Sequence, residues 1–484
     1  MLKAGREILK IPDYPLRDGL YLYGLFFLLI LVYYILPMPF RYIASMIMLI
    51  LFILSKEDYW WLALFFILYT GPWGLFAENT RDATVGIPLF SLGSGFSFSF
   101  IQVFFIISFL KALYLSPRFL SLFRSHFQRI FVYFAFLLVV ALFYGTRPAI
   151  IFDDLKVAVF WGFVFVLPAL IRKPDEAYRF LLLVLPVVFL VFIDAIYFLF
   201  TGGGYIYYLI YSASPVRDFE LMAGLDPEAN IRFAPYGWHA VLLGYIVSLA
   251  LAQVDRKHSV FLFMTAISAF AVVIISATRS WFIIFGLIAL FTMWRSKRIK
   301  SVVILAGMFL LLFFFLFSES SISREIFGGS LKRIVTVFDI NREGNYLPES
   351  MATKFTVRLP PQLELIRQNP VTGWGFTENR GDVDVGIFGH WVEVGLVGLA
   401  LFFYLWYDYI RLTGAAIKDR VIPVQYRNLI AVMLAGFLGL LISHFSTNQI
   451  FGITYYTVFI SIYFWITDIF LRSAFSIRAM RIAS

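Results

Sequence analysis

The chain contains no cysteine, and few of its side chains carry a charge. The absence of cysteine excludes disulfides, thiolate nucleophiles and cysteine-ligated metals. Only 14% of the 484 residues are charged and 61% are hydrophobic, whereas soluble domains are about 25% charged. The mean hydropathy is +0.83. No soluble fold could bury that much apolar surface, so the composition predicts a polytopic membrane protein.

Two common catalytic motifs are also missing. The sequence has neither an H-E-x-x-H pair nor a phosphate-binding P-loop, so we expect no zinc or nucleotide chemistry and no cofactor. The formal net charge of +10 would suit a nucleic-acid partner. In a membrane protein it first reflects the Lys/Arg bias of the inner loops, so we expect no nucleic-acid binding.

Apolar stretches of roughly span length follow one another along the whole chain. They predict an all-α fold: one transmembrane helical bundle over residues 1–484, with about fourteen spans. The predicted spans are 19–36, 40–54, 59–76, 97–115, 130–144, 154–171, 180–200, 236–254, 260–277, 281–294, 301–317, 391–408, 428–446 and 452–471.

Lysine and arginine gather at the two termini and in alternate loops of this scheme. The positive-inside rule therefore places both termini in the cytoplasm. The opposite, outer side receives the long inserts. These include loops 201–235 and 318–390, the second of which we expect to contain short helices and part of the active site.

Arginines on the outer side oppose this topological bias and need a reason. Acidic neighbours in the same loops are one explanation. An anionic substrate at the outer leaflet is another, because guanidinium binds phosphate in a planar, bidentate manner and stays charged at any relevant pH. Both explanations stay open for Arg232, Arg279, Arg358 and Arg367.

Three motifs occur in a fixed order in the second half of the chain. The first is ISATRSW, which contains Arg279. The second is RLPPQLELIRQNPVTGWGF, which begins at Arg358, and the third is D-(x)8-E-x-G-x-x-G, which begins at Asp384. This order resembles the O-antigen ligase and O-antigen polymerase superfamily of polytopic glycosyltransferases. The resemblance covers about residues 270–410 and extends weakly to 232–240; the first 200 residues match only in hydropathy.

The resemblance implies an inverting, metal-independent transferase of the GT-C type. Its donor would be a glycan on undecaprenyl diphosphate at the periplasmic face of the bacterial inner membrane. On the family pattern, Arg279 and Arg358 would clamp the diphosphate and stabilise the charge of the leaving group. Arg367 and Arg232 would support the residues that hold the diphosphate or contact the glycan. A snorkelling helix-end arginine is the alternative for Arg279, and a solvated loop charge is the alternative for Arg358.

One position departs from the family pattern. Ligases of the family carry a histidine about eleven residues before the first glycine of E-x-G-x-x-G, where this chain has Asp384. His390 lies too close to Gly395 to match it. The departure favours a polymerase and makes Asp384 the candidate to orient or deprotonate the acceptor hydroxyl.

Four further residues are expected to contact substrate. His390 could act as the base or be an interfacial histidine. Glu393 could bind substrate or complement the dipole at the start of a helix. His239 and His444 are expected at outer helix ends that face the site.

We therefore expect an enzyme that polymerises undecaprenyl-diphosphate-linked repeat units. Its partners would be lipid-linked donor and acceptor, the bilayer and a chain-length regulator. The enzymatic alternative is an O-antigen ligase that transfers glycan to lipid A–core. The non-enzymatic alternative is a flippase-type polysaccharide or lipid transporter, which should show inverted repeats and broken midplane helices. The sequence shows no internal repeat.

Overall fold

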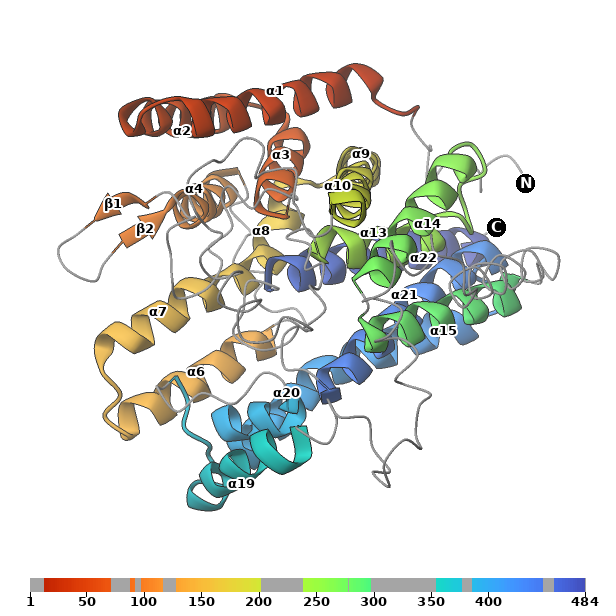
Figure 1. Cartoon of the computed structure of the whole chain (residues 1–484). Coiled ribbons are helices and arrows are strands. Elements are labelled where there is room, and N and C mark those ends of the chain that lie inside the picture. Colours follow the sequence, from red (N-terminus) through yellow and green to blue (C-terminus); the bar gives the residue numbers. More distant parts are fainter. Residues whose placement is uncertain are drawn as a thin grey trace.

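The computed structural model describes residues 13–70, 88–91, 97–115, 128–201, 238–276, 278–296, 354–376, 385–446 and 457–483. Figure 1 shows these segments as a bundle of helices, with α1 and α2 along one side and α19 and α20 at the opposite side. The helices of the first half are α1 (Leu16–Ile35), α2 (Met38–Leu54), α3 (Asp58–Thr70), α4 (Phe100–Leu115), α6 (Gln128–Phe143), α7 (Pro148–Ala158), α8 (Phe163–Leu170), α9 (Pro174–Val184) and α10 (Val187–Thr201).

The second half contributes the helices that surround the candidate site. These are α13 (Trp238–Leu251), α14 (Ser259–Ile275), α15 (Arg279–Ser296), α19 (Leu359–Gln368), α20 (Ile387–Lys418), α21 (Val424–Ser446) and α22 (Thr457–Ala483). Two short turns complete the set: a 3-10 turn, η2 (Val159–Gly162), and a π-helical turn, η3 (Lys354–Arg358).

Helices lie in every predicted range except 301–317, which is outside the described residues. Four helical segments are long and apolar enough to cross a membrane: Pro174–Phe198, Ile387–Lys418, Val424–Phe445 and Val458–Ala479. Shorter apolar helices pack among them. The chain is therefore a helical, membrane-embedded protein.

The predicted all-α class is confirmed, but one predicted span is wrong. The range 154–171 is not one helix, because it divides into α7, η2 and α8. A short antiparallel pair accompanies the helices: β1 (Pro88–Ser91) pairs with β2 (Ser97–Ser99), with Phe90 opposite Phe98. The Ser-Phe-Ser sequence of β2 has the two-residue repeat of a strand.

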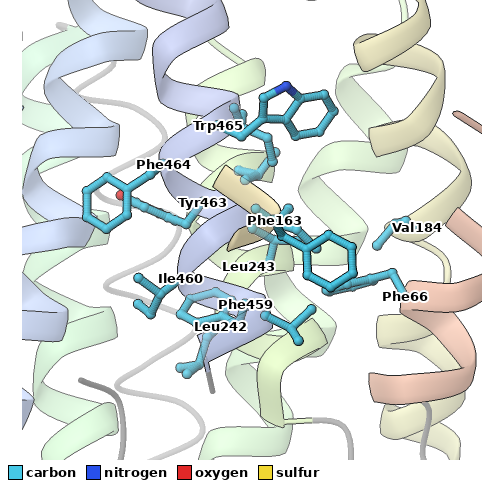
Figure 2. Close-up of a cluster of buried hydrophobic side chains, with 14 of the residues drawn as sticks. Phe66, Phe163, Val184, Leu242, Leu243, Phe459, Ile460, Tyr463, Phe464 and Trp465 are labelled. Atoms are coloured by element: carbon cyan, nitrogen blue, oxygen red, sulfur yellow. The ribbon is translucent and has the colours of Figure 1, made fainter. Parts of the chain in front are cut away.

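Aromatic side chains fill the centre of the bundle (Figure 2). Phe163 of α8 and Phe66 of α3 lie in the same cluster as Trp465 of α22, and all three are buried. Trp465 meets the ring of Phe180 edge to face, with 5.4 Å between centroids, which is a favoured arrangement for aromatic pairs. This core joins the first and last thirds of the chain.

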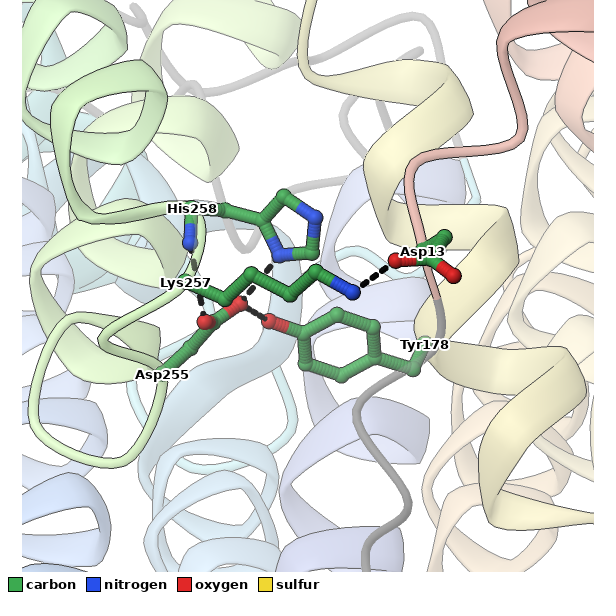
Figure 3. Close-up of polar contacts among 5 residues, drawn as sticks. All are labelled: Asp13, Tyr178, Asp255, Lys257 and His258. Atoms are coloured by element: carbon green, nitrogen blue, oxygen red, sulfur yellow. Dashed lines mark hydrogen bonds and ion pairs between the residues drawn. The ribbon is translucent and has the colours of Figure 1, made fainter.

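One end of the bundle is held by charged groups, which we call the ion-paired end (Asp13, Tyr178, Asp255, Lys257 and His258). Asp255 is completely buried in the turn between α13 and α14. Its carboxylate accepts hydrogen bonds from the Tyr178 hydroxyl and from the backbone N–H of His258, and its other contact is the His258 ring, 2.7 Å away (Figure 3). Lys257 pairs with Asp13, just before α1.

Other ion pairs join segments that lie far apart in the sequence. Arg129 at the start of α6 lies 2.8 Å from Asp408 of α20, and its guanidinium is 3.7 Å from the centroid of the Tyr404 ring. Arg478 of α22 pairs with Asp419, which follows α20, at 2.8 Å. Arg129, Arg478 and Lys257 of the ion-paired end all lie in segments that the sequence predicts to be cytoplasmic.

Candidate functional site

The helix α20 is broken at Gly395. This residue has φ of 62° and ψ of −174°, which is not a helical conformation. A continuous helix would separate His390 and Phe402, twelve residues apart in the sequence, by about 18 Å along its axis. Their rings are instead 4.8 Å apart. Residues 387–394 therefore fold back as a short helix against the remainder of α20.

The loop of residues 369–376, here called the docked loop, occupies the break. In a continuous helix, the carbonyls of Val392 and Glu393 would accept hydrogen bonds from the N–H groups four residues later. Here Val392 O accepts from Trp374 N at 3.0 Å, and Glu393 O accepts from Gly375 N at 2.8 Å. The docked loop thus supplies the donors that the break removes.

The same loop supplies the missing acceptors. Leu396 N donates to Pro370 O at 3.0 Å, and Val397 N donates to Val371 O at 3.0 Å. These four main-chain groups, which would pair with one another in a continuous helix, are consequently hydrogen-bonded to the docked loop. Such pairing is what allows a non-helical backbone to persist among membrane helices.

The glycines of the second and third motifs make this joint sterically feasible. A Cβ at Gly373 would lie 2.7 Å from Glu393 O, and one at Gly375 would lie 2.7 Å from Leu137 O of α6. Gly373, Gly375 and Gly395 all have positive φ, where side chains are strained. N-P-x-x-G-x-G and E-x-G-x-x-G are thus two halves of one joint.

Below the break, three polar side chains form a buried hydrogen-bonded chain. The Tyr133 hydroxyl of α6 lies 2.7 Å from His390 Nε2, and His390 Nδ1 lies 2.8 Å from His444 Nε2 of α21. His390 and His444 are 1% and 0% exposed. The structure therefore brings together two of the predicted substrate contacts. His390 is therefore enclosed by protein on all sides.

The backbone of Arg279 lies at the level of His444. α15 and α21 run antiparallel, because Asn428 Nδ2 contacts Arg295 O at 3.5 Å and a Cβ at Gly439 would lie 2.6 Å from Ile284 Cγ2. His444 lies five residues after Gly439, and Arg279 lies five residues before Ile284. In two antiparallel helices these equal steps lead to the same level along the helix axes. The Arg279 side chain lies outside the described part of the structure.

His239 shares this level. The Tyr245 ring of α13 stacks on Phe285 of α15, with centroids 3.9 Å apart. His239 lies six residues before Tyr245, and Arg279 lies six residues before Phe285, on helices that the α13–α14 and α14–α15 turns make parallel. His239 is buried, with 1% of its surface exposed. The ends of α13, α15 and α21 therefore converge near the break; together with the docked loop they form what we call the broken-helix end.

The remaining predicted arginines lie on or beyond α19, which packs against α20. Arg358 ends η3 and directly precedes α19, and its side chain is exposed. Arg367, also exposed, lies 3.7 Å from Glu364 one turn away. The expectation that loop 318–390 contains short helices is confirmed by α19, which follows Arg358 and ends just before Asn369. Arg232 lies outside the described residues.

The interpretation of Glu393 as a first-turn carboxylate is wrong. α20 begins at Ile387 and breaks at Gly395, so Glu393 lies in the last turn of the short helix, where the dipole disfavours a negative charge. Its side chain is half-buried. Asp384 lies outside the described residues; with Asp382 it forms a D-x-D pair, a spacing of carboxylates that can also bind a divalent cation.

Two tyrosines belong to the site although no sequence pattern marks them. Tyr133 lies in an aromatic-rich apolar helix, where one tyrosine resembles any other packing residue. Tyr144, just after α6, donates to Asn369 Oδ1 at 2.8 Å and lies 3.1 Å from Thr372 Oγ1. It therefore fixes the docked loop from the α6 side. The roles of Tyr133 and Tyr144 become visible only from their hydrogen-bond partners on other elements.

No protein-family model matches the chain, and no curated protein matches it.

Proposed function

We propose that the chain is a bacterial inner-membrane glycosyltransferase that polymerises undecaprenyl-diphosphate-linked oligosaccharide repeat units at the periplasmic face. The growing glycan would pass from its lipid diphosphate to a hydroxyl of an incoming unit, with inversion and without a metal. A GT-C-like bundle of about fourteen spans with cytoplasmic termini belongs to the same proposal.

The observation that carries this proposal is the convergence of the three ordered motifs. The second and third motifs form one joint through four main-chain hydrogen bonds. The first motif places the backbone of Arg279 level with His444, which is hydrogen-bonded to His390 of the third motif. Residues far apart in the sequence must meet in this way if they serve one reaction.

The arginines supply the chemistry that the transfer needs most. The leaving diphosphate gains negative charge as the glycosidic carbon–oxygen bond breaks, and fixed positive groups stabilise it best where water is scarce. Arg279 starts a helix, and Arg358 lies beside the start of α19. In the proposal they approach the diphosphate from different elements.

Transport is a second candidate, because broken helices are typical of transporter binding sites. In such sites, however, the carbonyls released by the break coordinate the cargo. Here the docked loop occupies both released carbonyls and both released N–H groups. The break in α20 therefore supports a rigid joint better than an ion or substrate site.

A glycan gel tests the proposal in cells. A strain that lacks the chain should carry single repeat units on lipid A–core, and the full ladder should return when the chain is restored. Polymer that accumulates on its lipid carrier would instead indicate the ligase, and an unchanged ladder would contradict both enzymes.

Arginine variants sharpen the same gel. Arg279→Ala and Arg358→Ala should each shorten or abolish the ladder at unchanged protein level, because each removes a charge from the leaving group. Arg420→Ala is the matched control, since Arg420 is an exposed arginine in the turn between α20 and α21. A normal ladder in both variants would disprove the clamp.

A chelator tests the metal-free mechanism. This experiment is necessary because Asp382 and Asp384 form a D-x-D pair. Turnover by the purified protein should be unchanged in EDTA. Loss of turnover that Mg²⁺ or Mn²⁺ restores would show that these carboxylates hold a metal and that the arginines act beside it.

A further inference from the structure

Apolar and basic side chains lie next to one another in η3, where Phe355, Val357 and Arg358 are all exposed. We propose that η3 and α19 form a membrane-surface element (residues 354–368) that lies in the plane of the membrane. In it, Phe355 and Val357 insert into the lipid interface, and Arg358 lies at the depth of the lipid phosphates. The partner is an anionic lipid surface. This contact goes beyond the proposed reaction and holds whichever reaction the site carries out.

The docked loop lies at the membrane surface opposite the Arg129–Asp408 ion pair. Arg129 is near the start of α6, which is 16 residues long. A helix of this length spans about 24 Å, close to the hydrocarbon thickness of about 30 Å. Directly beyond the far end of α6, Tyr144 contacts the docked loop. The docked loop, and the end of α19 that leads into it, therefore lie where the hydrocarbon ends.

Amphipathic aromatic residues gather at this level. Trp391 Nε1 donates to Pro370 O at 2.9 Å. Trp374 Nε1 donates to Leu365 O at 3.3 Å, and its ring lies 5.5 Å from that of Tyr144. Tryptophan and tyrosine are enriched where hydrocarbon meets water, because they combine an apolar ring with a polar atom. The three rings around the docked loop therefore support its position at the interface.

The lipid-facing surface of α20 continues onto the docked loop. Leu396 and Phe403 are exposed on α20, a helix long and apolar enough to cross a membrane, so they face lipid. Val371 of the docked loop is also exposed, and its carbonyl accepts a hydrogen bond from Val397 N at 3.0 Å. Apolar surface thus extends from the membrane-spanning helix to the segment that directly follows α19.

The exposed side chains of η3 determine the orientation of α19. This helix packs against α20 and buries Gln362 and Ile366. If α19 stood along the membrane normal, its 10 residues would carry η3 about 15 Å into water. Phe355 and Val357 would then be 51% and 64% exposed to water, although large exposed apolar side chains usually mark a membrane or protein contact. A helix in the membrane plane keeps both side chains in the lipid interface.

The charge of the membrane-surface element suits an anionic lipid surface. It contains three basic residues, Lys354, Arg358 and Arg367, but only one acid, Glu364. Glu364 lies 3.7 Å from Arg367, which leaves the rest of the element positive. Basic residues beside exposed apolar ones are typical of segments that lie in the lipid interface, and guanidinium groups bind phosphate oxygens well. Arg358, directly after Val357, therefore lies at the depth at which a lipid presents its phosphate.

Spin-label accessibility measures this contact directly. The chain has no cysteine, so a single-cysteine variant carries one nitroxide at a known position. We would label Val357→Cys in the full chain, in nanodiscs of phosphatidylcholine with or without phosphatidylglycerol. Collision rates with oxygen, which concentrates in lipid, and with a water-soluble nickel chelate give the depth of the label. Leu142→Cys on the exposed side of α6 is the lipid reference, and Arg420→Cys in the turn after α20 is the water reference.

We expect the label at Val357→Cys to lie about 5–10 Å into the boundary between headgroups and acyl chains. Phosphatidylglycerol should deepen it, and Arg358→Gln in the same variant should weaken this dependence on anionic lipid. Leu363→Cys on α19 should report the same depth, whereas an upright helix would separate the two labels by about 9 Å. If Val357→Cys fails to fold, Phe355→Cys takes its place with the same expected depth.

Three outcomes would overturn the inference. Nickel collisions as frequent as at Arg420→Cys would place η3 in water, and few collisions with either reagent would show that protein covers it. A depth that ignores phosphatidylglycerol would exclude recognition of anionic lipid. None of these measurements needs turnover, so they separate the membrane contact from the proposed reaction, which fails instead if deletion of the chain leaves the glycan ladder unchanged.

Discussion

The ion-paired end and the broken-helix end hold their buried polar groups by different means. At the ion-paired end, the charge of Asp255 is satisfied by Tyr178 of α9 and by His258 of the same turn. At the broken-helix end, main-chain groups of the docked loop complete an interrupted helix, and the buried histidines contact each other and Tyr133. The first arrangement satisfies its charges within the protein.

The second arrangement uses helix breakage to place side chains where a regular helix could not. A helix that continued through Gly395 would carry His390 away from Phe402 and His444. Structural irregularity of this kind is retained where the surrounding structure fixes it. The ion-paired end therefore stabilises the bundle, whereas the broken-helix end is organised around particular side chains.

The largest expected effect distinguishes the joint from an ordinary helix. Gly395→Ala should prevent folding or destabilise the protein by more than about 3 kcal/mol, since it combines a strained backbone with a clash against the docked loop. Gly414→Ala in the same helix is the control. Gly414 has open space around its Cβ position, so this change should be neutral or slightly stabilising.

Thermal unfolding of the two purified variants in detergent measures this difference. Equal melting temperatures would mean that the break at Gly395 is not a fixed feature of the fold.

An intermediate effect is expected at the ion-paired end. Asp255→Ala removes the acceptor of Tyr178 and His258 and should lower the free energy of unfolding by about 2 kcal/mol, because buried donors are left unsatisfied. The glycan ladder of cells that contain equal amounts of this variant should keep its length. A shortened ladder at normal protein level would give this end a part in the reaction.

The smallest effect should come from the exposed pair. Asp13→Asn breaks the contact with Lys257, but the two side chains are 86% and 53% exposed. Such pairs contribute about 0–1 kcal/mol and weaken with salt. Chemical denaturation at low and at high salt should therefore show a small difference from the parent that disappears at high salt; a large, salt-independent loss would mean that the pair is structurally essential.

The sequence predicted the two ends unequally. Hydropathy located the helices well, because a run of about 20 apolar residues is typical of a membrane-spanning helix. The break in α20 escaped prediction, since E-x-G-x-x-G is compatible with a continuous helix and the partners of the break come from the loop before it. The spacing of the third motif favoured Asp384 over His390 as a site residue. The contact between His390 and His444 could not be predicted, because it depends on the fold-back at Gly395 and on the docked loop.

Turnover of lipid-linked repeat units by the purified protein tests the central claim most directly, with Arg279→Ala and Arg129→Ala compared side by side. Arg279→Ala should retain its fold and lose about 10²- to 10³-fold in rate, as expected for one stabilising group at a developing charge. Arg129→Ala should lose stability, because it breaks the pair with Asp408, and keep its rate. Full turnover by Arg279→Ala would contradict the assignment of the chemistry to the broken-helix end.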